Sequence, residues 1–229
     1  FSYPEEFWKL NQQLEGDSAP LQDYISRRYF DLTRNFQRYS WLLVYLFGAS
    51  PALCASFLAG REHDLLERFD HSLYRPQATS LRMSDLGYQN NAQSSLASSS
   101  HNLDEYVSTL THAIKTPEPA YEKIGVKVGD DYRQLNTNIL QIENEYYSSI
   151  RPKRTINPGE RPTTALQERG VEYIEIRALD LNPFEPVGIN QQEIRFLDLF
   201  ATYCLLRESP QLEKCDLHAS KENLRKVVY

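Results

Sequence analysis

Residues 169–184 read RGVEYIEIRALDLNPF, and this stretch predicts the strand around which the chain is organised. Side chains of an extended strand point alternately to opposite faces, so every second residue shares a face. One face, apolar at its centre and expected to bury against helices, consists of Glu172, Ile174, Ile176, Ala178 and Asp180. The opposite face consists of Val171, Tyr173, Glu175, Arg177 and Leu179.

Glu175 and Arg177 stand two residues apart on this second face. At a rise of about 3.3 Å per residue their Cβ atoms lie roughly 7 Å apart, so a metal ion on the carboxylate can share an anionic ligand with the guanidinium. Mg²⁺ and arginine together neutralise charge on a transferring phosphoryl group, and the pair therefore fits phosphoryl chemistry. A salt bridge on a solvated sheet face is the alternative that this strand alone leaves open.

The composition is that of a folded, acidic chain. Of its 229 residues 41% are hydrophobic, which suffices for a substantial core. The net charge of −6 argues against nucleic acid as a partner, although small anionic ligands need only local positive charge. The longest apolar run, residues 41–47, is far below the roughly 20 residues that span a bilayer, so no membrane partner is expected. The scattered Cys54, Cys204 and Cys215 predict no disulfide framework or zinc site, which favours a reducing cytoplasm.

Apolar spacing and capping residues predict the helices. A long helix is expected over residues 21–47 and a second over residues 51–58, capped by Ser50. Further helices are expected over residues 103–115, 118–124, 163–169 and 191–207, with a last one beginning at Ser220. Two of these begin with the spacing of a capping box, namely Asn102 with Glu105 and Asn190 with Glu193.

Extended segments are few and widely spaced. Residues 134–150 alternate imperfectly and predict one long strand with a bulge, followed by a basic run at 151–154 that is expected either to hold phosphates or to be solvated. Residues 1–8 are expected to end a further strand, and residues 74–97 to form a polar loop with a mobile Ser-rich patch at 94–100. Helices and long strands without a βαβ rhythm predict an α+β fold with an antiparallel sheet.

The common nucleotide-binding and hydrolase motifs are missing. The sequence contains no GxxxxGK[ST], GxGxxG, GxSxG or HExxH, and its 5 histidines have no ligand spacing. Phosphoryl transfer in this chain would therefore rest on a metal held by carboxylate and on arginines of a sheet face.

Four long motifs follow one another along the chain: YLFGASPA at 45–52, SLRMSDLGYQN at 80–90, LQIENEYYSSIRPKR at 140–154 and RGVEYIEIRALDLNPF at 169–184. In this order and spacing they resemble the bacterial type of glutamate–cysteine ligase over nearly the whole chain. The resemblance implies a partial glutamine-synthetase-like catalytic fold, α+β, with helices packed on an antiparallel sheet. It also implies ATP- and Mg²⁺-dependent ligation of the glutamate γ-carboxylate to the cysteine amine through a γ-glutamyl phosphate, the first step of glutathione biosynthesis.

The resemblance also implies roles for individual residues. Glu175 is expected to be a magnesium ligand, and Arg177 to bind the phosphoryl group and the tetrahedral centre of the reaction. Arg82 is expected to pair with a carboxylate of a substrate. The other substrate-binding residues that the resemblance implies are Tyr88, Asn144 and Tyr147. These assignments agree with the chemistry of the side chains, since glutamate is a hard oxygen donor and arginine recognises carboxylates through two N–H groups.

The resemblance covers only the centre of such a ligase. Family members continue beyond both ends, and their upstream part supplies further acidic metal ligands and a His-x-Asn motif. Residues 1–229 are therefore expected to be the central portion of a single catalytic domain, truncated at both ends and inactive alone. A related carboxylate–amine ligase with another amine substrate stays open, as does a non-catalytic interaction domain, which would be expected to have lost the Glu175 and Arg177 pair.

Overall fold

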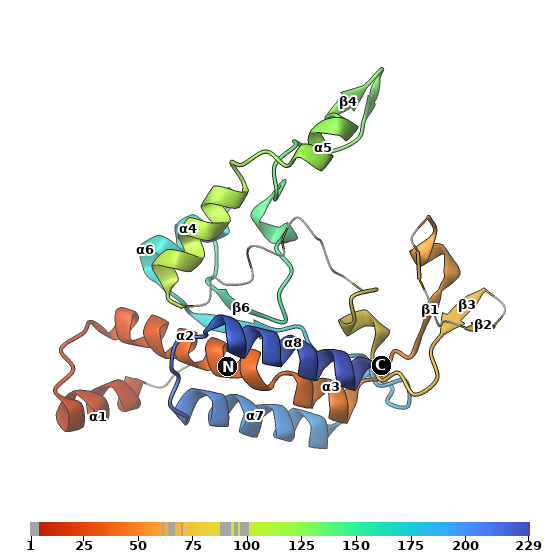
Figure 1. Ribbon diagram of the computed structural model, residues 1–229. Coiled ribbons are helices and arrows are strands. Elements are labelled where there is room, and N and C mark those ends of the chain that lie inside the picture. The colour runs from red at the N-terminus through yellow and green to blue at the C-terminus, as the bar shows by residue number, and fades with distance from the viewer. Residues whose placement is uncertain are drawn as a thin grey trace. The chain divides into compact units, whose positions relative to one another are not determined.

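The computed structural model describes residues 5–60, 62–63, 67–69, 71–87, 93, 96 and 101–229 (Figure 1). The chain forms two compact units, Phe1–Arg34 with Asn90–Glu175 and Asn35–Gln89 with Ile176–Tyr229. Helix α2 (Leu21–Tyr39) and strand β7 (Tyr173–Ile176) contribute residues to both units. That the whole chain belongs to a single catalytic domain stays a prediction.

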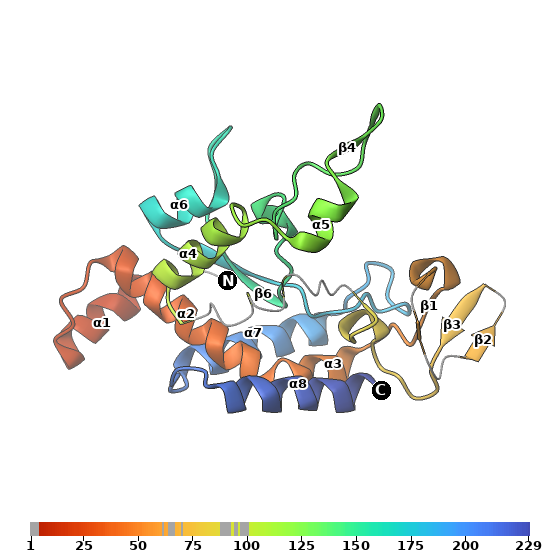
Figure 2. The same cartoon turned by 45° about the horizontal axis from the view of Figure 1, so that its top comes forward.

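The first unit is mainly helical. Its remaining elements are α1 (Glu5–Glu15), α4 (Leu103–Ala113), α5 (Pro119–Ile124), β4 (Lys127–Val128), β5 (Asp131–Tyr132), η4 (Glu143–Glu145), β6 (Ile150–Lys153) and α6 (Pro162–Arg169). Helix α4 packs beside α6, and β6 pairs with β7 (Figures 1 and 2). Tyr106 lies at the centre of the aromatic core, with its ring 5.9 Å from Phe30 and 6.1 Å from Tyr146, both edge-on.

The second unit combines three helices with a small sheet. Its elements are α3 (Trp41–Phe47), β1 (Ala52–Cys54), η1 (Ala55–Leu58), β2 (Glu67–Phe69), β3 (Ser72–Tyr74), η2 (Leu81–Met83), α7 (Gln191–Leu206) and α8 (Lys214–Val228). Strand β3 lies between β1 and β2 and is antiparallel to both. Helix α3 packs against α8 (Figure 1). The ring of Phe47 lies 5.3 Å from that of Phe196 on α7.

Helices that begin with a strong cap were predicted well. The Asn102 side chain accepts a hydrogen bond from Glu105 N, and Asn190 with Glu193 forms a complete capping box. Two other helix predictions are wrong in their bounds. The long helix over residues 21–47 is broken into α2 and α3 by a tight turn at Ser40, where Leu43 N donates to Ser40 O. The last helix begins at Lys214, because Glu213 and not Ser220 caps it.

Three predictions of element type are wrong because contacts outweigh local propensity. Residues 51–58 form β1 and η1 instead of a helix, since β1 pairs with β3. Residues 5–8 belong to helix α1 instead of a strand, while residues 1–4 lie outside the described ranges. Residues 134–150 are mostly loop, because side-chain amides such as those of Asn136 and Gln141 bind neighbouring backbone groups.

The α+β class is confirmed by this mixture of helices and small antiparallel sheets. Likeness to glutamine synthetase stays a prediction. The Ser-rich patch at 94–100 lies largely outside the described residues. Across the described ranges, no helix combines the length and the apolar character that crossing a bilayer requires.

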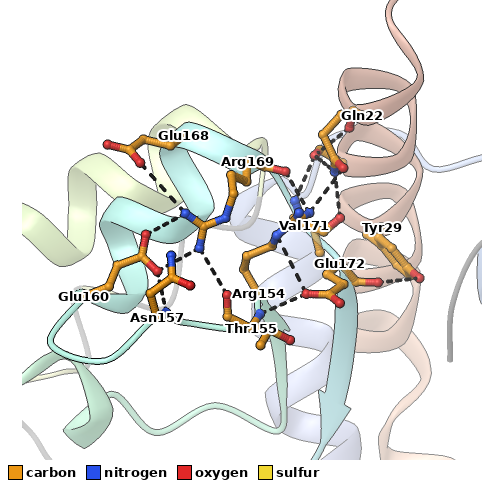
Figure 3. Close-up of polar contacts among 11 residues, drawn as sticks. Gln22, Tyr29, Arg154, Thr155, Asn157, Glu160, Glu168, Arg169, Val171 and Glu172 are labelled. Carbon is orange, nitrogen blue, oxygen red and sulfur yellow. Dashed lines mark hydrogen bonds and ion pairs between the residues drawn. The ribbon is translucent and has the colours of Figure 1, made fainter.

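The central strand is shorter than predicted, and side chains of helix α2 hold the residues just before it (Figure 3). Ser26 Oγ accepts from Val171 N at 3.0 Å, and Gln22 Nε2 donates to Val171 O at 2.8 Å. Tyr29 Oη donates to Glu172 O at 3.3 Å. These contacts satisfy backbone groups at the start of the strand and thereby tie it to the helix.

An ion pair and hydrogen bonds join the loop after β6 to Arg169, at the end of α6, and to Glu172 (Figure 3). The guanidinium of Arg169 binds both carboxylate oxygens of Glu160, at 2.6 and 2.7 Å, and donates to Thr155 O. Arg154 Nη1 donates to Arg169 O at 2.8 Å, and Thr155 N donates to the Glu172 carboxylate at 2.9 Å. The hydrogen bonds from Arg169 hold the pKa of Glu160 at about 2.

Gly170→Ala is expected to destabilise the protein by about 2–5 kcal/mol. Gly170 has φ +70°, and a Cβ there would lie 2.6 Å from both Gln22 Nε2 and Ser26 Oγ. The matched control is Gly159→Ala, because Gly159 has φ +80° but open space at its Cβ position. This variant is expected to lose only about 1–2 kcal/mol of unfolding free energy. Urea unfolding measures the free energy of unfolding of both variants. Equal losses of this free energy would contradict a steric clash between the added Cβ at position 170 and helix α2.

Glu160→Gln is expected to destabilise the protein at neutral pH and progressively less in acid. The folded-state pKa of about 2 lies below the ordinary 4.5, so ionised Glu160 stabilises the fold above pH 4.5 and this contribution is lost as pH falls through about 2. Urea midpoints of variant and parent should therefore converge over this range. Glu168→Gln is the control, since this carboxylate is 63% exposed and 3.9 Å from Arg169. A difference in urea midpoint between Glu160→Gln and the parent that stays constant down to pH 2 would refute the stabilisation by ionised Glu160.

Candidate functional site

Glu175 lies in β7 with one carboxylate oxygen in an unusual environment. Its side chain is 40% exposed, yet Oε2 is buried and accepts no hydrogen bond from the described residues. The ammonium group of Lys153, on the paired strand β6, lies 3.4 Å from this oxygen. A buried carboxylate oxygen without a donor is an oxygen that a cation can use.

Arg177 is the first residue after β7, and its main chain is fixed by Arg82. The guanidinium of Arg82, on η2, donates through Nη1 to Arg177 O at 3.2 Å and through Nη2 to Leu179 O at 2.7 Å. The structure thus brings together Arg82 and Arg177, which lie 95 residues apart in the sequence. Both side chains are half-buried.

Asp180 is a buried acid at this site to which the sequence analysis assigned no role. Its side chain is 3% exposed and accepts from Arg82 Nε at 2.6 Å, Ser50 Oγ at 2.7 Å and Ala49 N at 2.9 Å. Burial by itself would raise the pKa of Asp180, but these hydrogen bonds outweigh it and hold the pKa below its ordinary value. In the sequence, only its position on the apolar face of the predicted strand indicated that this acid would be buried.

The contacts of Arg82 limit the role predicted for it. A guanidinium has five N–H groups, and at least three of those of Arg82 donate within the chain. At most two remain for the carboxylate of a substrate. That pairing stays a prediction.

The other predicted substrate-binding residues lie in the first unit or outside the described ranges. Asn144 is exposed in η4, and its carbonyl accepts from Arg151 Nη1 at 3.5 Å. The amide of Tyr147 donates to Gln93 Oε1 at 3.0 Å. Both residues lie on the segment that leads into β6, the partner strand of Glu175. Tyr88 lies outside the described residues, so its predicted role is untested.

The basic run at 151–154 is largely engaged by acids of β7 and its approach. Lys153 pairs with Glu175, and Arg154 Nε lies 3.7 Å from Glu172. Arg151 is buried, with 6% of its surface exposed. The expectation of a merely solvated run is therefore wrong, because Lys153 and Arg154 pair with acids and Arg151 is buried.

The described residues fit only part of a metal site. Glu175 offers an oxygen ligand of the kind that Mg²⁺ prefers. In the part of the chain that the structure describes, no three His, Cys, Asp or Glu side chains are grouped so that they could hold a metal ion. Glu175 therefore fits the group as one ligand among several.

Comparison with known proteins matches this chain to one family along its length. The glutamate–cysteine ligase family model matches residues 1–227. The glutamate–cysteine ligase of Alcanivorax borkumensis is 92% identical over 234 aligned positions, which cover 100% of this chain and 45% of that protein. The enzyme of the same name from Pseudomonas paraeruginosa is 60% identical and is covered to 40%. The chain thus spans less than half the length of these relatives.

Solved structures agree with the sequence comparison. The crystal structure of Francisella tularensis glutamate–cysteine ligase in complex with AMP superposes with a TM-score of 0.85 at 40% identity, over 98% of this chain and 44% of that one. A bifunctional glutathione synthetase from Pasteurella multocida shares the fold, with a TM-score of 0.69 at 23% identity. From the family model and these identities, the chain belongs to the glutamate–cysteine ligase family.

Proposed function

We propose that this chain is part of an enzyme that joins the γ-carboxylate of glutamate to the amine of cysteine with ATP and Mg²⁺, in the first step of glutathione biosynthesis. The observation that carries the proposal is the buried Oε2 of Glu175, which accepts no hydrogen bond from the described residues and lies 3.4 Å from the ammonium group of Lys153. Glu175 stands two positions before Arg177, whose main chain is held by Arg82. Support also comes from the names of relatives and from the AMP in the Francisella tularensis ligase.

The proposed reaction needs no covalent enzyme intermediate. An oxygen of the glutamate γ-carboxylate attacks the γ-phosphorus of ATP, the bond to the leaving ADP oxygen breaks, and γ-glutamyl phosphate forms. The cysteine amine then attacks the acyl carbon, inorganic phosphate leaves, and the amine gives up a proton. Charge develops on phosphoryl oxygens in the first step and on the acyl oxygen in the second. The guanidinium of Arg177, whose main chain is held by Arg82, is proposed to stabilise both.

Glu175 is proposed to hold Mg²⁺, with its other ligands outside the described residues. When bound, the ion would neutralise phosphate charge and act as a Lewis acid. Arg82 is proposed to bind a substrate carboxylate, and Tyr88, Asn144 and Tyr147 to line the pocket for the amino acids. The cytoplasm is the proposed location, in keeping with three free cysteines, Cys54, Cys204 and Cys215.

The direct test of this function uses the Alcanivorax borkumensis ligase with its matching segment replaced by this chain. Given ATP, Mg²⁺, glutamate and cysteine, the chimera should form γ-glutamylcysteine, ADP and phosphate in equal amounts, measured by mass spectrometry and a phosphate assay. Replacing cysteine by 2-aminobutyrate and other amines tests the alternative of a related ligase. Faster product formation with an amine unlike cysteine would favour that alternative, and no product with any amine would refute both.

Glu175→Gln in this chimera is expected to lower turnover by at least about 100-fold and to raise the Mg²⁺ concentration needed for half-maximal rate. Glutamine keeps the shape of the side chain but lacks the charge that a Mg²⁺ ligand supplies. The matched control is Glu172→Gln. Glu172 is an acid one residue before the same strand, and its carboxylate pairs with Arg154. Its Mg²⁺ dependence should match that of the parent. Near-normal turnover of Glu175→Gln at low Mg²⁺ would rule out the assignment.

A further inference from the structure

The carboxylate of Asp180 is the buried centre of a polar cluster in the second unit. It accepts hydrogen bonds from Arg82 Nε, Ser50 Oγ and Ala49 N, and only 3% of its side chain is exposed. Ser50 Oγ also lies 3.0 Å from Ser80 Oγ, one residue before η2. A charged acceptor with several donors in a buried place fixes the position of each donor.

Arg82 passes this constraint on to the main chain that follows β7. While Nε binds Asp180, Nη1 and Nη2 donate to the carbonyls of Arg177 and Leu179. Ala178 between them is buried, with 2% of its surface exposed. The backbone on both sides of this residue is therefore held by one planar group.

The main chain of Arg82 lies in a tight turn. A Cβ at Gly87 would lie 1.9 Å from Arg82 O, so the turn after η2 closes directly on it. Ser84 Oγ donates to Leu81 O at 2.7 Å inside the same turn. The guanidinium thus extends from a tight turn, and its Nε donates to Asp180.

We propose that Asp180 is a positioning residue, which orients the Arg82 guanidinium so that it holds the main chain of Arg177 where the Arg177 side chain meets the transferring phosphoryl group. The inference rests on the proposed function, because it assumes the role given there to Arg177. Its alternative is an anchor that contributes only stability, by joining residues 49–50 to the segment after β7.

A double-mutant cycle separates the two roles, because a residue that acts through Arg177 loses its effect when Arg177 is gone. The variants are Asp180→Asn, Arg177→Ala and the pair, in the chimera with the Alcanivorax borkumensis ligase. Asparagine keeps the shape of the side chain but turns an N–H donor towards one of the donors that Asp180 binds. The measurements are kcat, the KM for ATP and the thermal midpoint.

The matched control is Asp31→Asn. Asp31 is also an acid with little exposure, 16%, and it pairs with arginines, at 2.9 Å to Arg28 and closely to Arg34. It belongs to the first unit, whereas Asp180, Arg82 and Arg177 belong to the second. It should lower the thermal midpoint and leave kcat within about 2-fold, as expected for a loss of stability alone.

The expected result is a fall in kcat of at least about 100-fold for Arg177→Ala and of about 10- to 100-fold for Asp180→Asn, with a smaller change in the KM for ATP. On the Arg177→Ala background, Asp180→Asn should lower kcat by less than about 3-fold. Two results would overturn the inference and leave the proposed function intact. One is an equally large fall in kcat for Asp180→Asn with Arg177 present and with Arg177→Ala. The other is a lower thermal midpoint of Asp180→Asn with unchanged kcat. Unchanged kcat in Arg177→Ala would overturn both the inference and the proposed function.

Ser50→Ala provides a second test of the inference if Asp180→Asn does not fold. It removes one donor to Asp180 and leaves the acid and Arg82 in place. A fall in kcat of about 2- to 5-fold in the parent, absent on the Arg177→Ala background, would support the inference. Unchanged kcat in the parent would overturn it.

Discussion

Backbone groups on both sides of β7 are satisfied by side chains from distant parts of the sequence, and the position of the candidate site depends on these bonds. Gln22 and Ser26 bind the main chain at Val171, and Arg82 binds the carbonyls of Arg177 and Leu179. A buried backbone group without a partner costs about 1–3 kcal/mol, so each of these side chains is hard to replace. The residues that bind this backbone therefore determine where the side chains of the candidate site lie.

Charge at the site is arranged in pairs. The chain as a whole carries a net charge of −6, and two cations of the candidate site lie beside acids of the β7 segment, Lys153 beside Glu175 and Arg82 beside Asp180. Pairing keeps the guanidinium and ammonium groups in place while the substrate is absent. A metal ion bound at Glu175, as proposed, would have to compete with the ammonium group of Lys153, which lies 3.4 Å from the same oxygen.

The sequence predicted what short-range chemistry determines. Capping by Asn102 and Asn190 acts over three residues, and the strand carrying Glu175 follows from alternation, although its ends do not. The loop over residues 134–150 was missed because its amide side chains bind nearby backbone, which alternation does not reveal. The bond between Arg82 and Asp180 spans 98 residues, and no local pattern encodes it. The family resemblance implied a role for Arg82, but only the structure shows that Arg82 donates to Asp180.

Arg82 binds main-chain carbonyls after β7, and every amino acid has such a carbonyl. The hydrogen bond at position 177 therefore does not require a particular side chain there. A substitution at 177 can keep this bond, whereas a substitution at 82 removes it whatever side chain 177 carries. In evolutionary terms, the side chain at 177 and the support of its backbone can vary separately.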